Sequence, residues 1–133
     1  MPTMERPGDL PEHFHTEDGY TCYRPVADVT FSELVELCSA ALTYSRIHNL
    51  ERLLVDTTGL TGFQRPTTIE RFTLGERCAV AASGALTVAF LAKAEMIDPD
   101  FFGARVARNR GLRVSIFASE AAAVQWLLDP SSQ

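Results

Sequence analysis

Short apolar and polar blocks alternate along the chain, and the spacing within each block predicts its secondary structure. From Thr30 to about His48 the apolar residues recur every three or four positions, and Thr30 and Glu33 are spaced as a capping box, which predicts a helix. Two apolar runs, 52–56 and 86–91, each predict a strand that is buried on both faces. Such strands are typical of a parallel sheet covered by helices.

Before this helix, two short segments at 12–16 and 20–24 flank Glu17-Asp18-Gly19. Asp-Gly between segments that contain Phe and Tyr predicts an antiparallel hairpin. After the strand at 52–56, a loop rich in Gly and Thr leads to a second predicted helix at 67–82. Thr67 caps this helix and Glu70 completes its capping box.

Gly75 lies inside the second helix and is expected to bend or weaken it. A third helix is predicted to start with Asp98 as its cap and Pro99 at its first position, and to end at Gly111. The segment 113–117 predicts a fifth strand. Ser119 caps a last helix, whose residues expected to dock on the sheet are Ala123, Trp126 and Leu127.

The predicted order is β-β-α-β-α-β-α-β-α, an α/β fold with a mixed sheet of about five strands and helices packed on it. Strand–helix–strand crossovers are almost always right-handed, so one antiparallel edge should border an otherwise parallel sheet. We expect residues 1–11 to form a flexible leader, 12–129 a single α/β domain, and 130–133 a tail in which Pro130 stops the last helix.

The amino-acid composition limits the classes of protein to which this chain can belong. The 133 residues are 46% hydrophobic and 22% charged, which is typical of a globular protein. No apolar run approaches the roughly 18 residues of a membrane span, and no signal peptide is visible, so we expect a cytoplasmic protein. The net charge of −5 argues against a nucleic-acid partner.

The three cysteines are odd in number and widely spaced, so they are expected to form neither a disulfide framework nor a CxxC zinc pair. Cys38 and Cys78 lie among apolar neighbours at helical spacing and are expected to be small buried side chains. His13 and His15 have the spacing of two ligands on one strand face, with Cys22 across the hairpin. Since a metal site usually needs more ligands, we expect no metal and no cofactor.

Several segments together carry a resemblance to a known family: Leu53-Leu54-Val55-Asp56 before a glycine-bearing loop, the Arg71-Phe72 helix, and the closing run 114–121 with Trp126-Leu127 after it. With the element order, they resemble the STAS domains, whose prototypes are bacterial anti-sigma-factor antagonists, and most closely the stand-alone SpoIIAA-like branch. The resemblance covers about residues 12–128. It implies a STAS-like fold and a regulatory role through protein contacts.

The resemblance also implies a phosphoacceptor at a helix N-terminus. The antagonists are switched at a Ser in an Asp-Ser-Ser-Gly motif, and Asp56-Thr57-Thr58-Gly59 is similar to it in composition. Thr67 and Thr68 match its position at the start of the following helix, where free N–H groups favour a phosphate. The alternative is that Thr67 only caps the helix.

Asp56 also ends a predicted parallel strand, the place where open α/β sheets usually bind ligands. With the loop at 57–67 it is a candidate site for a small molecule or anion. The structural alternative is that Asp56 accepts backbone N–H bonds in its own turn.

A possible partner surface lies on the third helix. Arg105 and Arg108 share one face near its C-terminal end, with Arg110 and Arg113 beyond, and they suit either the helix dipole or an acidic partner. Phe101 and Phe102 mark an apolar site if either ring points outward.

Three functional hypotheses follow. The first is a non-enzymatic regulatory or protein-interaction module of STAS type with a protein partner still unknown. The second is a carrier or sensor of a small apolar or anionic ligand, which uses a pocket near Asp56 and Phe101. An enzyme comes last, because no nucleophile, base and orienting group are suitably spaced. The hairpin edge also makes a homodimer possible.

Overall fold

A five-stranded mixed sheet forms the centre of this computed structural model, which describes residues 11–129. The strand order is β1-β2-β4-β6-β7. The first strand, β1 (Phe14–Thr16), is antiparallel to β2 (Thr21–Tyr23), as the Asp-Gly turn predicts. The strands β2, β4 (Arg52–Asp56), β6 (Thr87–Leu91) and β7 (Arg113–Phe117) are parallel. The predicted mixed sheet with one antiparallel edge is therefore confirmed.

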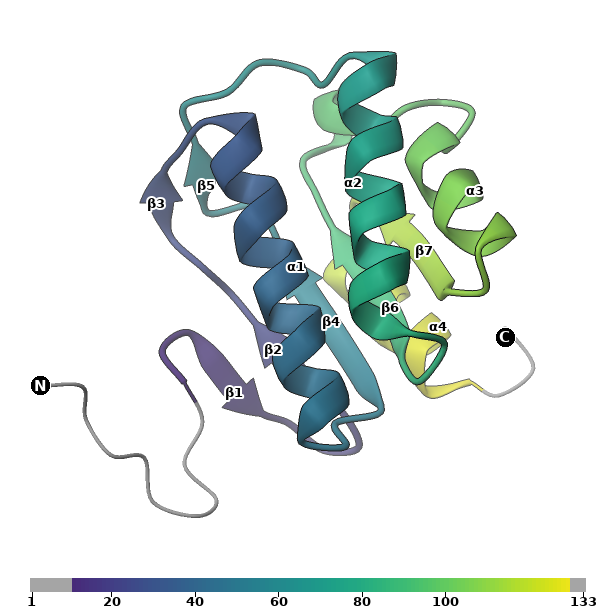
Figure 1. Cartoon of the computed structure of the whole chain (residues 1–133). Helices are drawn as coiled ribbons and strands as arrows, with labels where there is room; N and C mark the ends of the chain where they lie inside the picture. Colours follow the sequence, from purple (N-terminus) through teal and green to yellow (C-terminus); the bar gives the residue numbers. More distant parts are fainter. Residues whose placement is uncertain (1–10, 130–133) are drawn as a thin grey trace, which may run out of the picture.

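Helices cover both faces of the sheet. Three of them, α1 (Phe31–Ile47), α2 (Thr68–Ala82) and α3 (Phe102–Asn109), lie side by side on one face, and α4 (Glu120–Leu128) lies behind the sheet (Figure 1). Along the chain, β2, β4, β6 and β7 follow one another from one side of the sheet to the other. Crossovers of one hand therefore place their three helices on the same side.

The alternation of side chains along the strands creates two separate apolar cores. Leu53 and Val55 of β4 pack toward α1 and α2, whereas Leu54 between them packs toward α4. Because successive side chains of a strand point to opposite faces, an uninterrupted apolar strand supplies both cores at once. Ala123 and Leu127 of α4 are buried in the second core, as predicted, and Trp126 packs beside them.

Side-chain caps start three of the four α-helices at the predicted residues. Thr30 and Thr67 each accept a hydrogen bond from the third helical N–H, and the carboxylate of the Glu at that position accepts one from the backbone N–H of the cap residue. Ser119 accepts from Ala122 N at 3.2 Å. These interactions are local in sequence, which is why the pattern alone predicts them.

The predicted start of the third helix is wrong. The chain leaves β6 into a 3₁₀ turn (Ala94–Met96), and α3 begins only at Phe102. Phe101 has a left-handed backbone (φ 52°), so Pro99 lies outside the helix. Asp98 still satisfies the helix start, because its Oδ2 accepts the Phe102 N–H at 2.8 Å. Gly111 follows the helix with φ 95°, the C-terminal role predicted for it.

The sequence pattern does not predict a second, two-stranded sheet, in which β3 (Ala27–Asp28) pairs in parallel with β5 (Leu60–Thr61). Strands of two residues are too short to show a period. Gly62 follows β5 with φ 99°, and a Cβ there would lie 2.5 Å from Asp28 Oδ1, so this close pairing requires glycine.

Among residues 11–129, no helix is both long and apolar enough to cross a bilayer. The predicted leader falls almost entirely on residues 1–10 and the predicted tail on 130–133, all of which lie outside the described residues.

Candidate functional site

An apolar cavity of about 110 Å³ lies between the sheet and the helices α1 to α3, toward the carboxyl end of the parallel strands. A cavity holds one water when its volume measured in this way is about 10–15 Å³, so this cavity has room for a molecule well beyond water. Its lining residues are Phe31, Leu34, Thr57, Leu60, Phe63, Pro66, Arg71, Leu74, Gly75, Cys78, Phe90, Ala92, Lys93, Met96, Ile97, Asp98, Phe101, Gly103, Ala104, Ala107, Leu112, Val114 and Ile116.

The cavity has a buried end and a mouth. Cys78, Ala107, Leu112 and Val114 are buried and form the inner end. The mouth is formed by segments that follow strands, including Thr57 after β4 and the residues after β6. This position agrees with the general rule that open α/β sheets bind ligands at the carboxyl ends of their strands.

Phe101 lies at the mouth and remains 39% exposed. Its left-handed backbone is unusual for a bulky residue and costs about 1–2 kcal/mol. Two bonds hold the turn: Phe101 N donates to Asp98 O at 2.9 Å, and Arg105 N donates to Phe101 O at 2.9 Å. Phe102 is half-buried and is not part of the cavity wall, so of this predicted pair only Phe101 belongs to the site.

Asp56 itself does not line this cavity, whereas its neighbour Thr57 and the predicted Phe101 both do. Like Leu54, Asp56 faces α4, whereas the next residue, Thr57, faces the cavity. The Thr57 hydroxyl donates to Leu91 O at 2.9 Å and fixes the end of β4 to β6. The predicted ligand loop is thus divided between the two faces of the sheet.

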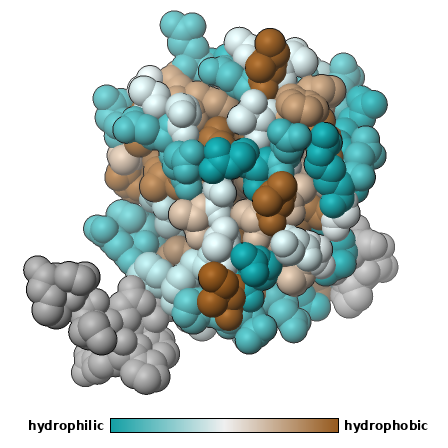
Figure 2. Space-filling view, viewed as in Figure 1, coloured by the Kyte–Doolittle hydropathy of each residue, from teal (hydrophilic) through white to brown (hydrophobic). Residues whose placement is uncertain are grey.

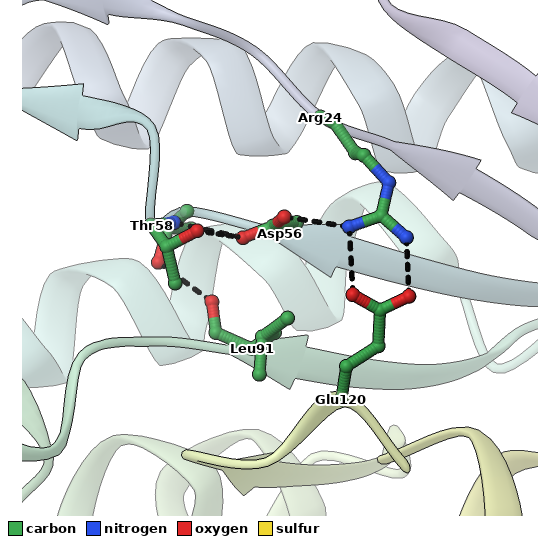
Figure 3. Close-up of polar contacts among 6 residues, drawn as sticks. Arg24, Asp56, Thr58, Leu91 and Glu120 are labelled. Carbon is green, nitrogen blue, oxygen red and sulfur yellow. Dashed lines mark hydrogen bonds and ion pairs between the residues drawn. The ribbon is translucent and has the colours of Figure 1, made fainter.

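A clamp of three charged side chains lies on the α4 side (Figure 3). Arg24 donates through Nη1 to Asp56 Oδ2 at 2.7 Å and to Glu120 Oε1 at 3.1 Å, and through Nη2 to Glu120 Oε2 at 2.6 Å. The other oxygen of Asp56 accepts from Thr58 N at 2.9 Å and from Thr58 Oγ1 at 2.6 Å. Both carboxylate oxygens are therefore occupied, as in the structural alternative for Asp56.

The clamp also affects its surroundings electrostatically. Hydrogen bonds to Glu120 raise the pKa of Arg24 further above its ordinary value, so the guanidinium stays charged. Beside it, burial raises the pKa of the Cys22 thiol to about 11, although the Arg24 charge acts in the opposite direction. Cys22 is consequently a neutral thiol at physiological pH and no nucleophile.

Thr67 and Thr68 are both exposed at the start of α2, next to Pro66 at the cavity mouth. Thr67 Oγ1 accepts from Glu70 N at 3.1 Å, which is the capping role. Thr68 is the first residue of the helix. These two threonines are separate from Thr57 and Thr58, so the structure does not unite the four predicted positions in one site.

Three of the four arginines in the predicted patch form contacts with other residues of the protein. Arg108 donates to Val114 O at 2.8 Å and to Ser115 Oγ at 3.1 Å, and Arg113 donates to Thr87 Oγ1 at 3.0 Å. Arg110 contacts Glu76 at 3.5 Å and lies 5.3 Å from the centre of the Phe72 ring. Only Arg105 projects as an exposed cation with none of these contacts.

The cysteines and histidines that the sequence offers as reactive groups or metal ligands do not form a site. All three cysteines are buried free thiols, as predicted for Cys38 and Cys78. His13 lies outside β1 with φ 72°, so it does not alternate regularly with His15. Within the part of the chain that is described, no three His, Cys, Asp or Glu side chains gather where they could hold a metal ion.

Sequence reasoning missed four residues of these sites: Arg24 and Glu120 in the clamp, and Arg71 and Lys93 at the cavity mouth. The sequence does contain two features that point to these sites. Arg24 and Lys93 each come shortly after an apolar strand, and the two-residue period of β4 implies that Asp56 and Thr57 face opposite sides.

The fold and site define an α/β protein with an apolar cavity at the carboxyl edge of a mixed sheet. In comparisons with known proteins, no family model, no curated protein and no solved structure matches the chain.

Proposed function

We propose that this protein is a non-catalytic binding module, a carrier or sensor that holds a small apolar ligand in the cavity beneath α2 and α3. The cavity is the observation that carries the proposal. Protein interiors are packed as densely as organic crystals, and an empty cavity costs stability in proportion to its volume. A cavity of about 110 Å³ with an apolar inner end is explained if a ligand fills it.

A non-catalytic role is supported by the state of the reactive groups. Asp56 is engaged by Arg24 and Thr58, and burial raises the pKa of Cys78, the thiol in the cavity wall, to about 12. A thiol with such a pKa stays protonated and unreactive at neutral pH. The resemblance to STAS domains, which act by binding, favours the same role.

The proposal is tested by titration with N-phenyl-1-naphthylamine, a neutral apolar dye that fluoresces when shielded from water. We expect saturable binding of one dye per chain. The variant Ala104→Leu adds bulk to the cavity wall and should weaken binding about tenfold or more, since three added carbons occupy space that the dye needs.

Ala122→Leu is the matched control. Ala104 and Ala122 are each the third residue of their helices, but Ala122 is exposed on α4. This variant should bind the dye as the parent protein does. The proposal fails if the parent protein shows no saturable binding, or if folded Ala104→Leu, verified by circular dichroism, binds equally well.

A second candidate is the regulatory module of STAS type that acts through a protein partner. It is favoured by the exposed Thr67 and Thr68 at the start of α2, the position of the phosphoacceptor in the antagonists that the chain resembles. Mass spectrometry of the protein from the cells that make it tests this candidate. Phosphate on either residue supports it, and no phosphate on Thr57, Thr58, Thr67 or Thr68 while the kinases are shown to be active removes the switch.

A further inference from the structure

The polar groups of the cavity wall are concentrated at its mouth. Only four of the lining residues carry a polar or charged side chain: Thr57, Arg71, Lys93 and Asp98. Thr57 and Lys93 follow strands β4 and β6, and Asp98 precedes α3. The inner end, toward Leu112 and Val114, is apolar apart from the neutral thiol of Cys78. A ligand that satisfies both ends therefore has one polar and one apolar part.

Arg71 is the central cation of the mouth. It is half-buried in the first turns of α2, and its Nε donates to Pro66 O at 3.1 Å. Its terminal nitrogens have no further hydrogen-bond partner among residues 11–129. Burial lowers the pKa of this guanidinium, because a partly desolvated cation lacks full compensation. An anion at the mouth would supply the missing partner.

The charges around Arg71 favour an anion over a cation. Lys93 is exposed at the mouth and forms no ion pair with the described residues. Asp98 is the only acidic residue of the wall, and its Oδ2 already accepts the Phe102 N–H. Two cations face one carboxylate, so the mouth is locally positive in a chain whose net charge is −5.

We propose that the ligand is an amphipathic carboxylate, which binds with its anionic head at Arg71 and Lys93 and its apolar tail directed toward Leu112. This inference rests on the proposed binding function and names its ligand class. A guanidinium and a carboxylate form charge-assisted hydrogen bonds, which are stronger than neutral ones. A neutral ligand leaves Arg71 partly desolvated and without an ion-pair partner, and a wholly polar anion cannot fill the inner end.

The test measures displacement of the neutral dye by three molecules with the same ten-carbon tail: decanoate, decan-1-ol and decyltrimethylammonium. We expect decanoate to bind about tenfold more tightly than the alcohol, and the cation to bind most weakly. Arg71→Met keeps the apolar stem but removes the charge, and should abolish the advantage of decanoate. Arg71→Lys should restore part of it.

Arg105→Met on α3 is the matched control. It removes an exposed arginine away from the cavity wall and should leave all three affinities unchanged. Equal affinities for decanoate and decanol would overturn the head-group assignment, as would an Arg71→Met variant that weakens both equally. If the dye itself shows no saturable binding to the parent protein, the proposed function is wrong, so the two failures are distinguishable.

Discussion

At the scale of single residues, Arg24 joins three parts of the chain that are far apart in sequence. It lies just after β2 and binds Asp56 at the end of β4 and Glu120 at the start of α4. The side chain of Asp56 is only 12% exposed, compared with 49% for Glu120. Its carboxylate therefore depends most on the arginine, because a charge taken out of water needs a partner.

We expect Arg24→Met to lower the free energy of unfolding by about 2 kcal/mol, since it leaves Asp56 with an uncompensated charge. Arg77→Met is the control. Arg77 forms a single ion pair with Glu36 on the surface, where water screens the charges, so its loss should cost clearly less than the loss of Arg24. Urea unfolding measures the free energy of unfolding of both variants.

Adding Asp56→Asn to Arg24→Met should recover part of the lost stability. The amide oxygen still accepts the Thr58 N–H, while the unpaired charge disappears. If the double variant is less stable than Arg24→Met alone, the buried charge is not the cause of the loss.

At the scale of the elements, α2 and α3 approach each other through two glycines. A Cβ at Gly75 would lie 2.4 Å from Gly103 O, and a Cβ at Gly103 would lie 3.1 Å from Arg71 O. The helix α2 continues through Gly75 without interruption, so this glycine allows the close packing of two helices. The expectation that it marks a bend came from intrinsic propensity, which does not include the neighbouring helix.

Gly75→Ala should therefore destabilise the protein by about 1–3 kcal/mol, although alanine is the better helix former, because its methyl group meets backbone. Gly103→Ala should cost less, since its contact is longer. Thr73→Ala on the exposed face of α2 should change stability by less than about 0.5 kcal/mol. Thermal or urea unfolding measures the stabilities of the three variants. A Gly75→Ala variant as stable as Thr73→Ala would contradict the prediction.

Hydrophobic side chains on the outer face of α1 to α3 do not form a continuous surface. In Figure 2 the brown residues on this face are separated by teal and white ones. The exposed large side chains of α2 include Ile69 at 77% and Val80 at 69%. Isolated apolar residues of this kind are normal on protein surfaces, so the candidate ligand site remains the cavity beneath the helices.

At the scale of the whole molecule, the buried thiols connect stability to alkaline pH. Cys22 lies in the core beneath α4, and Cys38 and Cys78 lie in the core beneath α1 and α2. Burial raises the pKa of all three thiols above the ordinary value of 9.0, to about 11 for Cys22 and about 12 for Cys78. The native state therefore holds these protons to higher pH than the unfolded chain does.

A native pKa above the unfolded one means that the stabilising contribution is complete below about pH 9 and is lost as pH rises toward 11. We expect the free energy of unfolding, measured in urea under reducing conditions, to fall between pH 8.5 and roughly 10.5. Cys22→Ala should reduce this slope. At pH 8, a thiol reagent should label the native chain far more slowly than the unfolded one; rapid labelling of native protein would show that the thiols are accessible.

Local interactions explain how much of this fold was predictable. Some features depend only on residues a few positions apart, and these can be predicted from the sequence. They are the capping boxes at Thr30 and Thr67, the Asp-Gly hairpin and the apolar strands. The start of α3 was misplaced because Asp98 and Pro99 form a good local start signal, whereas the left-handed Phe101 delays the helix until Phe102.

The order of the four helices and of the five strands in the main sheet, and the burial of Cys38 and Cys78, followed from the pattern of apolar residues alone. The cavity, its positive mouth and the Arg24 clamp depend on atoms from distant segments: α2 meets the segment after β6, and β2 meets α4. Hydrophobic burial is set by local periodicity, but a cavity is the volume that several packed elements fail to fill. That volume is defined only once every element has its place.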